Sequence, residues 1–188
     1  MKKIFLALIF VFALSMIVSA EPVTPAATAT TAAAAAQKPV FDNVISANVW
    51  PYLGAFFNLG YERNLLANIS VRVRGEYWGL SSGGWTIGGY GVDLFYHPQA
   101  KGLDGFYFGP RFDTWFENYT GGGLTETGSL YWLGGQVGYR WINESGFVMA
   151  LSLGAFKNIA TSLNAKNSQP LFKDLLLPTF DFVLGWGF

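Results

Sequence analysis

The sequence predicts an all-β fold, an eight-stranded antiparallel up-and-down transmembrane β-barrel. Of the 188 residues, 51% are hydrophobic and 18% are aromatic, whereas only 13% are charged, about half the share usual in soluble domains. Beyond residue 40, no uninterrupted apolar run reaches the length of a membrane-spanning helix. Instead, apolar residues alternate with polar or small ones in segments separated by turn residues, which is the pattern of strands.

The first four expected strands differ in clarity. Residues 43–50 alternate weakly and are followed by Pro51, which could instead mark a turn or a bulge. Residues 54–63 and 85–96 alternate large apolar residues with small and polar ones. Residues 69–78 give the clearest pattern, because Ile, Val and Tyr alternate with Ser, Arg and Glu.

The next three expected strands cover residues 106–117, 129–142 and 146–157, where one face is mainly aromatic or aliphatic. Eight strands of this length match the smallest outer-membrane barrels, whose strand number is even and at least eight. The alternative topology is a soluble sandwich, which would bury the apolar face and expose the other face to water.

The last strand, residues 179–188, carries the strongest signal. Large apolar residues occupy one face of this strand. The opposite face carries mostly small residues and one carboxylate, Asp181, which suits a narrow packed interior better than open solvent. Its large apolar face, which we expect to point toward lipid, consists of Phe180, Phe182, Leu184, Trp186 and Phe188.

The N-terminal residues predict export and define the domain boundaries. Lys2 and Lys3 precede an apolar run, 4–18, and a small-residue cleavage site at Ala20, so residues 1–20 are predicted to be a signal peptide. An uncleaved membrane anchor is the alternative, but the run is short for a spanning helix. Residues 21–40, rich in Ala, Thr and Pro, are predicted to form a flexible periplasmic lead-in, with a short helix as the alternative. The barrel would then comprise residues 41–188.

An even strand number places both chain ends on the same side, which we expect to be the periplasm. Aromatic residues near strand ends would form the girdles at the membrane interfaces, although β-propensity alone also enriches such residues: Tyr61, Tyr77, Tyr96, Tyr139, Trp141, Trp186 and Phe188. The expected periplasmic turns are 64–68, 97–105 and 143–146, and the expected extracellular loops are 81–84, 118–127 and 158–174.

The faces opposite the apolar ones would share a single lumen. Because unpaired buried charges are costly, its arginines and carboxylates are expected to form an ion-pair network that fills the barrel; a polar conduit or proton-linked site is the alternative. An eight-stranded barrel is only wide enough for its side chains, and Trp78, Trp115 and Trp132 would also point inward, so we favour a filled lumen. The predicted network consists of Glu62, Arg72, Arg74, Glu76, Asp93, Arg111, Asp113, Glu117, Arg140 and Asp181.

Composition and motifs argue against several other functions. The formal net charge is zero, so no basic field would attract nucleic acid, and the absence of cysteine excludes disulfides and thiolate chemistry. The single histidine, His97, is expected in a periplasmic turn with no neighbouring serine, so we predict no catalytic residues. The glycine pairs lack the features of phosphate-binding loops, and we expect no cofactor and no metal.

Two hairpin motifs carry a resemblance to a known family. The segments Phe57-Asn58-Leu59-Gly60-Tyr61-Glu62-Arg63 and Gly138-Tyr139-Arg140-Trp141-Ile142, each followed by a turn and a new strand, are similar to hairpins of the small outer-membrane barrels of the OmpA- and OmpX-like kind, including uncharacterised relatives. The resemblance covers the chain from Asn43 onward. It implies residence in the outer membrane of a Gram-negative bacterium, and insertion by the barrel-assembly machinery, which would read the apolar face of the last strand and its final residue, Phe188.

The sequence therefore predicts a non-enzymatic outer-membrane barrel with a structural or surface-interaction role. Its partners would be outer-membrane lipid and lipopolysaccharide. Loop 158–174 is the best candidate contact surface, with an ordinary exposed loop as the alternative. A narrow transport barrel for small or hydrophobic molecules, with lateral exit near Pro110 or Pro178, is the alternative. A lipid-modifying enzyme is the third hypothesis.

Overall fold

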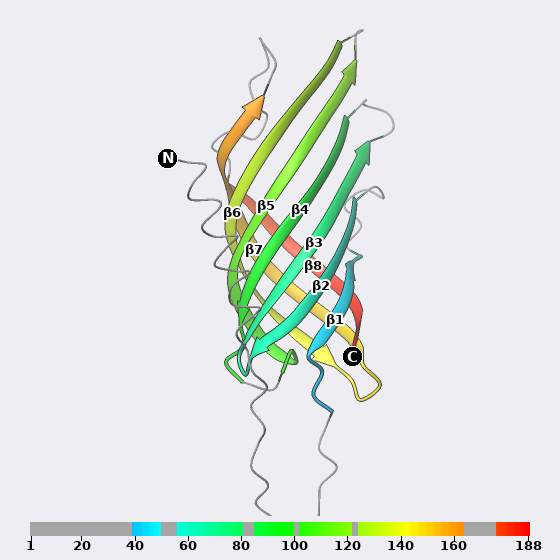
Figure 1. Ribbon diagram of the computed structural model, residues 1–188, viewed down its shortest axis with the longest axis vertical. Helices are drawn as coiled ribbons and strands as arrows, with labels where there is room; N and C mark the ends of the chain where they lie inside the picture. Colours follow the sequence, from blue (N-terminus) through cyan, green and yellow to red (C-terminus); the bar gives the residue numbers. More distant parts are fainter. Residues whose placement is uncertain (1–38, 50–55, 81–84, 100–101, 122–123, 164–175) are drawn as a thin grey trace, which may run out of the picture. The chain divides into compact units, whose positions relative to one another are not determined.

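Eight antiparallel strands close into a barrel in the computed structural model (Figure 1). Each strand pairs with the next in the sequence, and β1 pairs with β8 to complete the ring. The strands are β1 (Asn43–Asn48), β2 (Phe56–Leu66), β3 (Ile69–Leu80), β4 (Trp85–Tyr96), β5 (Gly105–Gly121), β6 (Leu124–Ile142), β7 (Phe147–Leu163) and β8 (Leu176–Gly187). The prediction of an eight-stranded antiparallel barrel with neighbouring strands joined in sequence order is confirmed.

The structure describes residues 39–49, 56–80, 85–99, 102–121, 124–163 and 176–188. The predicted signal peptide lies outside these residues, as does the lead-in apart from Pro39 and Val40. Val40–Phe188 forms one compact unit by its internal contacts. The described residues include no helix that is long and apolar enough to cross a membrane.

The expected bounds of β4 are those observed, but β5, β6 and β7 are longer than expected. The β5–β6 ladder continues to the pair Gly121↔Leu124, so the prediction of a loop over 118–127 is wrong. Thr120 faces Thr125 in this extension, and such β-branched cross-strand pairs stabilise a hairpin even when its side chains are polar. Likewise, β7 runs to Leu163, so the first part of the expected loop 158–174 is strand and 164–175 lies outside the described residues.

The two ends of the barrel hold different parts of the chain. We call the end where β1 begins and β8 finishes the termini end; the β2–β3, β4–β5 and β6–β7 connections lie there too. We call the other end the far end. β5 and β6 extend further toward the far end than β1 does, so the wall of the barrel is uneven in height (Figure 1).

The outer surface is apolar and aromatic. Phe57 is 68% exposed, Leu59 64% and Leu153 61%, although these are residue types that soluble domains bury. All seven residues expected in aromatic girdles are exposed on this surface. In β8, Trp186 is exposed, Phe180, Phe182 and Leu184 are half-buried, and Asp181 is buried. Phe188, which follows the strand, is exposed.

Candidate functional site: the charged lumen

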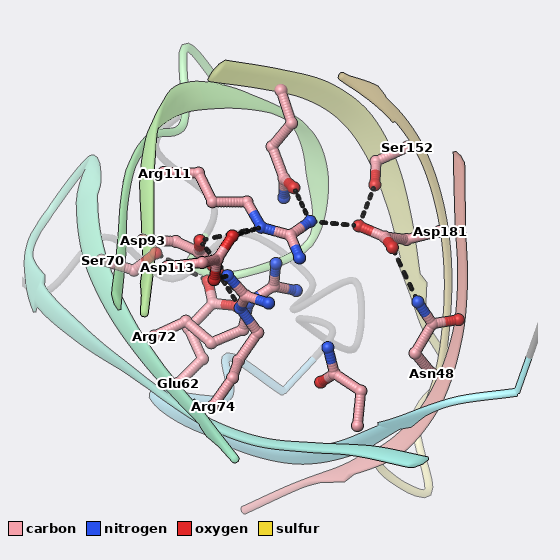
Figure 2. A network of polar contacts seen from close by, with 12 residues as sticks. Asn48, Glu62, Ser70, Arg72, Arg74, Asp93, Arg111, Asp113, Ser152 and Asp181 are labelled. Atoms are coloured by element: carbon pink, nitrogen blue, oxygen red, sulfur yellow. Dashed lines mark hydrogen bonds and ion pairs between the residues drawn. The ribbon is translucent and has the colours of Figure 1, made fainter. Parts of the chain in front are cut away.

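Strand alternation brings the charged residues of six strands into one interior. The side chains of the ten residues predicted to line the lumen are all buried, none more than 8% exposed. Figure 2 shows members of this set pointing from opposite walls toward the centre of the barrel. Within the described residues, nine of the ten form ion pairs with one another, and Glu117 is the exception.

Arg74 is the centre of the network. Its Nε lies 2.9 Å from Asp93 Oδ2, and its two terminal nitrogens also pair with Glu76 and Asp113. The guanidinium reaches from β3 past β4 to Asp113 on β5. Gly91 of β4 lies opposite both residues in the sheet, and a Cβ there would clash with both side chains. A glycine at position 91 therefore leaves the space that this contact needs.

Arg111 extends the network to the other side of the barrel. One terminal nitrogen, Nη1, donates both to Gln136 Oε1 at 3.1 Å and to Asp181 Oδ2 at 2.9 Å, and Nε donates to Asp113 Oδ2 at 3.1 Å. Its guanidinium also lies 4.4 Å from the centre of the Phe156 ring. Arginine suits this position, because its planar group offers donors in several fixed directions.

Asp181 connects this network to the seam between β1 and β8. Besides Arg111, it accepts hydrogen bonds from Asn48 Nδ2 at 2.6 Å and from Ser152 Oγ at 3.3 Å (Figure 2). Asn48 is the last residue of β1 and Asp181 belongs to β8, so this contact spans the seam that closes the barrel.

A second cluster lies nearer the termini end. Both terminal nitrogens of Arg140 donate to Glu62, at 3.1 and 2.5 Å, and one of them also donates to the carbonyl oxygen of Leu103. Ser70 Oγ lies 2.6 Å from Glu62 Oε1 and 2.9 Å from His97 Nε2. The expectation that His97 has no neighbouring serine is wrong, because His97 N donates to Asn68 O and the β2–β3 turn therefore lies beside it.

This Ser–His–Glu group does not have the geometry of a catalytic triad. Ser70 and Glu62 both approach the Nε2 side of His97, whereas in a triad the carboxylate orients the ring from the opposite nitrogen. His97 Nδ1 has no hydrogen-bond partner. Both Ser70 and His97 are 0% exposed, so no substrate can reach the hydroxyl in this arrangement.

Apolar side chains close the termini end below this cluster. Gly102, with a φ of +66°, lies in the β4–β5 connection next to Leu103, which is completely buried. The buried cluster formed there consists of Val44, Leu103, Ile142 and Val148, with Phe41 packed against it.

Aromatic residues occupy the lumen toward the far end. The rings of Trp115 and Trp132 lie 5.1 Å apart, and both pack with Leu130 and Phe156. Trp115 Nε1 donates to Glu76 Oε2 at 2.8 Å, which links this aromatic cluster to the ionic network. The side chain of Trp78, also expected to point inward, lies outside the described residues.

Several inward residues of the site were not singled out from the sequence. Ser70, Gln136 and Ser152 share the inward face with neighbouring lumen residues, so strand parity alone could have included them. Phe95 and Tyr107 also point inward, and their rings lie 4.9 and 5.0 Å from the guanidinium carbons of Arg72 and Arg140. No sequence signal indicated these aromatic contacts, because they join different strands.

The arrangement can neutralise and position buried charges. Within the described residues, no group of three or more acidic or histidine side chains could hold a metal ion. No protein-family model, no curated protein and no solved structure matches the chain. What can be stated of this protein is therefore its fold and its interior: it is a closed, eight-stranded antiparallel β-barrel with a buried ionic network inside it.

Proposed function

We propose that this protein is a non-enzymatic outer-membrane β-barrel of a Gram-negative bacterium, with a structural or surface-interaction role. The observation that carries the proposal is the distribution of polarity. The described barrel buries its paired charges inside and exposes large apolar and aromatic side chains outside, which is the reverse of a soluble protein. Lipid is the solvent that makes such an outer surface favourable.

The position of the termini supports an orientation. Both ends of the barrel sequence lie at the same end of the barrel, as in small barrels whose chain starts and finishes in the periplasm. The termini end would then face the periplasm and the far end the exterior. The resemblance of the hairpin motifs to OmpA- and OmpX-like barrels agrees with this orientation, and with assembly through the last strand.

The packing of the lumen supports a filled barrel rather than a pore. Apolar residues close the termini end, the ionic network crosses the middle, and the Trp115–Trp132 pair packs above it. An eight-stranded barrel leaves little room beyond its own side chains. A transport barrel with lateral exit gains no support at Pro178, because the β7–β8 ladder continues past it.

Membrane fractionation and gel migration test the location. We expect the protein in the outer-membrane fraction, with unheated samples migrating differently from heated ones because the barrel stays folded in detergent. A protein found in the soluble periplasmic fraction, with no heat-dependent shift, would overturn the proposal.

The absence of cysteine permits a sharper test with single labels. An environment-sensitive dye on Leu153→Cys, on the outer face, should be quenched by brominated lipid in reconstituted vesicles. The same dye on Ser145→Cys, in an exposed turn at the termini end, should not be quenched. Equal quenching at the two positions would contradict a membrane-embedded outer face.

Planar-bilayer recording tests the filled lumen. We expect no stable single channels from the reconstituted protein, under conditions in which a large porin conducts. Stable channels whose conductance changes in an Arg72 or Arg111 variant would favour the transport alternative instead.

A further inference from the structure

The charges of the lumen do not balance. Among the described residues, four buried arginines face six buried carboxylates: Arg72, Arg74, Arg111 and Arg140 against Glu62, Glu76, Asp93, Asp113, Glu117 and Asp181. All four arginines already contact carboxylates other than Glu117. The protein therefore provides no arginine of the network to neutralise Glu117.

Glu117 is buried without a partner. It is 8% exposed, and its Oε1 has no hydrogen bond. Taking a carboxylate out of water without a compensating partner costs several kcal/mol, so such a group either takes up a proton or recruits a cation. The choice depends on what surrounds it.

The surroundings of Glu117 suit a cation with an apolar stem. Its cross-strand neighbours are Ile87 on β4 and Gly128 on β6, and glycine leaves that side of the carboxylate without a side chain. Trp115 precedes it by two residues on the same face of β5 and packs at a tilt against Trp132. Indole faces attract ammonium groups, and a neighbouring carboxylate accepts their hydrogen bonds.

A bare metal ion fits this position less well. Glu117 belongs to no group of three or more described acidic or histidine side chains that could hold a metal. A divalent ion would need several oxygen ligands, whereas one carboxylate beside aromatic rings is enough for an organic ammonium ion.

We propose that Glu117, together with Trp115 two residues before it and Trp132 packed against Trp115, forms a binding site for an organic ammonium ion that enters the lumen from the far end. Glu117 lies on β5 beyond the ionic network in the direction of the far end, so a ligand would meet it before the arginines. The exposure of this end to the cell exterior rests on the proposed function, but the binding itself does not.

The test uses the full chain refolded in detergent, with propylammonium as the probe and ligand-observed NMR as the readout. We expect saturable binding that competes with other alkylammonium ions but not with sodium. Glu117→Gln should weaken it about tenfold or more, the effect of losing one charged hydrogen bond. Glu144→Gln, in an exposed turn at the termini end, is the matched control and should bind like the wild type.

Two further measurements keep the outcome decisive. Heat-dependent gel migration of Glu117→Gln shows that the variant has folded. An infrared difference spectrum between wild type and Glu117→Gln should show an ionised carboxylate when propylammonium is present. No binding, equal binding by Glu117→Gln, or a protonated carboxyl in the presence of the probe would overturn the proposal. None of these results would bear on membrane location, which the fractionation experiment tests separately.

Discussion

Glu62 and Glu117 are the same residue type on the same inward surface, yet the barrel treats them differently. Glu62 is 1% exposed, is held by Arg140 and Ser70, and lies near His97. Glu117 is 8% exposed and its Oε1 has no partner. Strand parity decides that both carboxylates point inward, but only the residues across the lumen decide whether a buried carboxylate is neutralised.

The difference follows from how the two ends are built. At the termini end, the β4–β5 connection brings in Leu103, whose carbonyl oxygen helps to hold Arg140 in place beside Glu62. Toward the far end, the neighbours of Glu117 are apolar or lack a side chain. Stability should therefore depend on the ionic groups at the centre and termini end, and binding on the unpaired group near the far end.

The largest effect is expected at the centre of the network. Arg74→Met leaves three buried carboxylates without this counter-charge, and should lower the free energy of unfolding by about 4–5 kcal/mol. Urea titration of the reconstituted protein measures this. Arg63→Met, an exposed arginine on the outer face, is the control and should change stability by about 0.5 kcal/mol or less. Similar losses in the two variants would argue against the network as the main stabilising element.

The second largest loss of stability is expected at Glu62, the carboxylate that is paired with an arginine. Glu62→Gln leaves Arg140 buried without its counter-charge, and should cost about 3 kcal/mol in the same titration. The double variant Glu62→Leu with Arg140→Met replaces both charges by apolar groups, and should recover most of that loss. If the double variant instead loses as much stability as Glu62→Leu and Arg140→Met lose separately when added together, the two residues do not act as a unit.

A smaller loss of stability is expected at Ser70, which lies between Glu62 and His97. Ser70→Ala removes the hydroxyl that contacts both Glu62 and His97, and should lower stability by about 1–2 kcal/mol. Ser152→Ala loses one longer contact, to Asp181 at 3.3 Å, and should lose less. The reverse order of the two losses would show that the cluster at the termini end is less important than its geometry suggests.

The smallest effect, with the opposite sign, is expected at Glu117. Glu117→Gln removes a buried charge that has no partner, and should raise the free energy of unfolding by about 1 kcal/mol or less. Comparing its urea midpoint with that of Glu62→Gln gives the contrast directly. A loss as large as that of Glu62→Gln would mean that Glu117 is neutralised within the folded protein.

The pattern of residues along the chain was enough to predict the strand number, the closure of the sheet in sequence order, and which side chains turn inward. The inward and outward faces follow from alternation along a single strand, which is local and has a period of two residues. Closure was expected because the number of such segments matches the smallest outer-membrane barrels. Strand ends were predicted less well. The β5–β6 hairpin extends through polar residues such as Thr120 and Thr125, because backbone hydrogen bonds continue the ladder whatever the polarity of the side chains.

Which charges meet could be read only from the folded barrel. Arg74 reaches Asp113 past Gly91, Arg111 reaches Asp181 across the lumen, and His97 meets Ser70 where two connections come together. Each contact depends on the stagger of strands far apart in the chain and on the space that one small residue leaves, neither of which the alternation of a single strand specifies. The same geometry leaves Glu117 alone, so one buried carboxylate that looked like its neighbours in the sequence has a different chemistry in the fold.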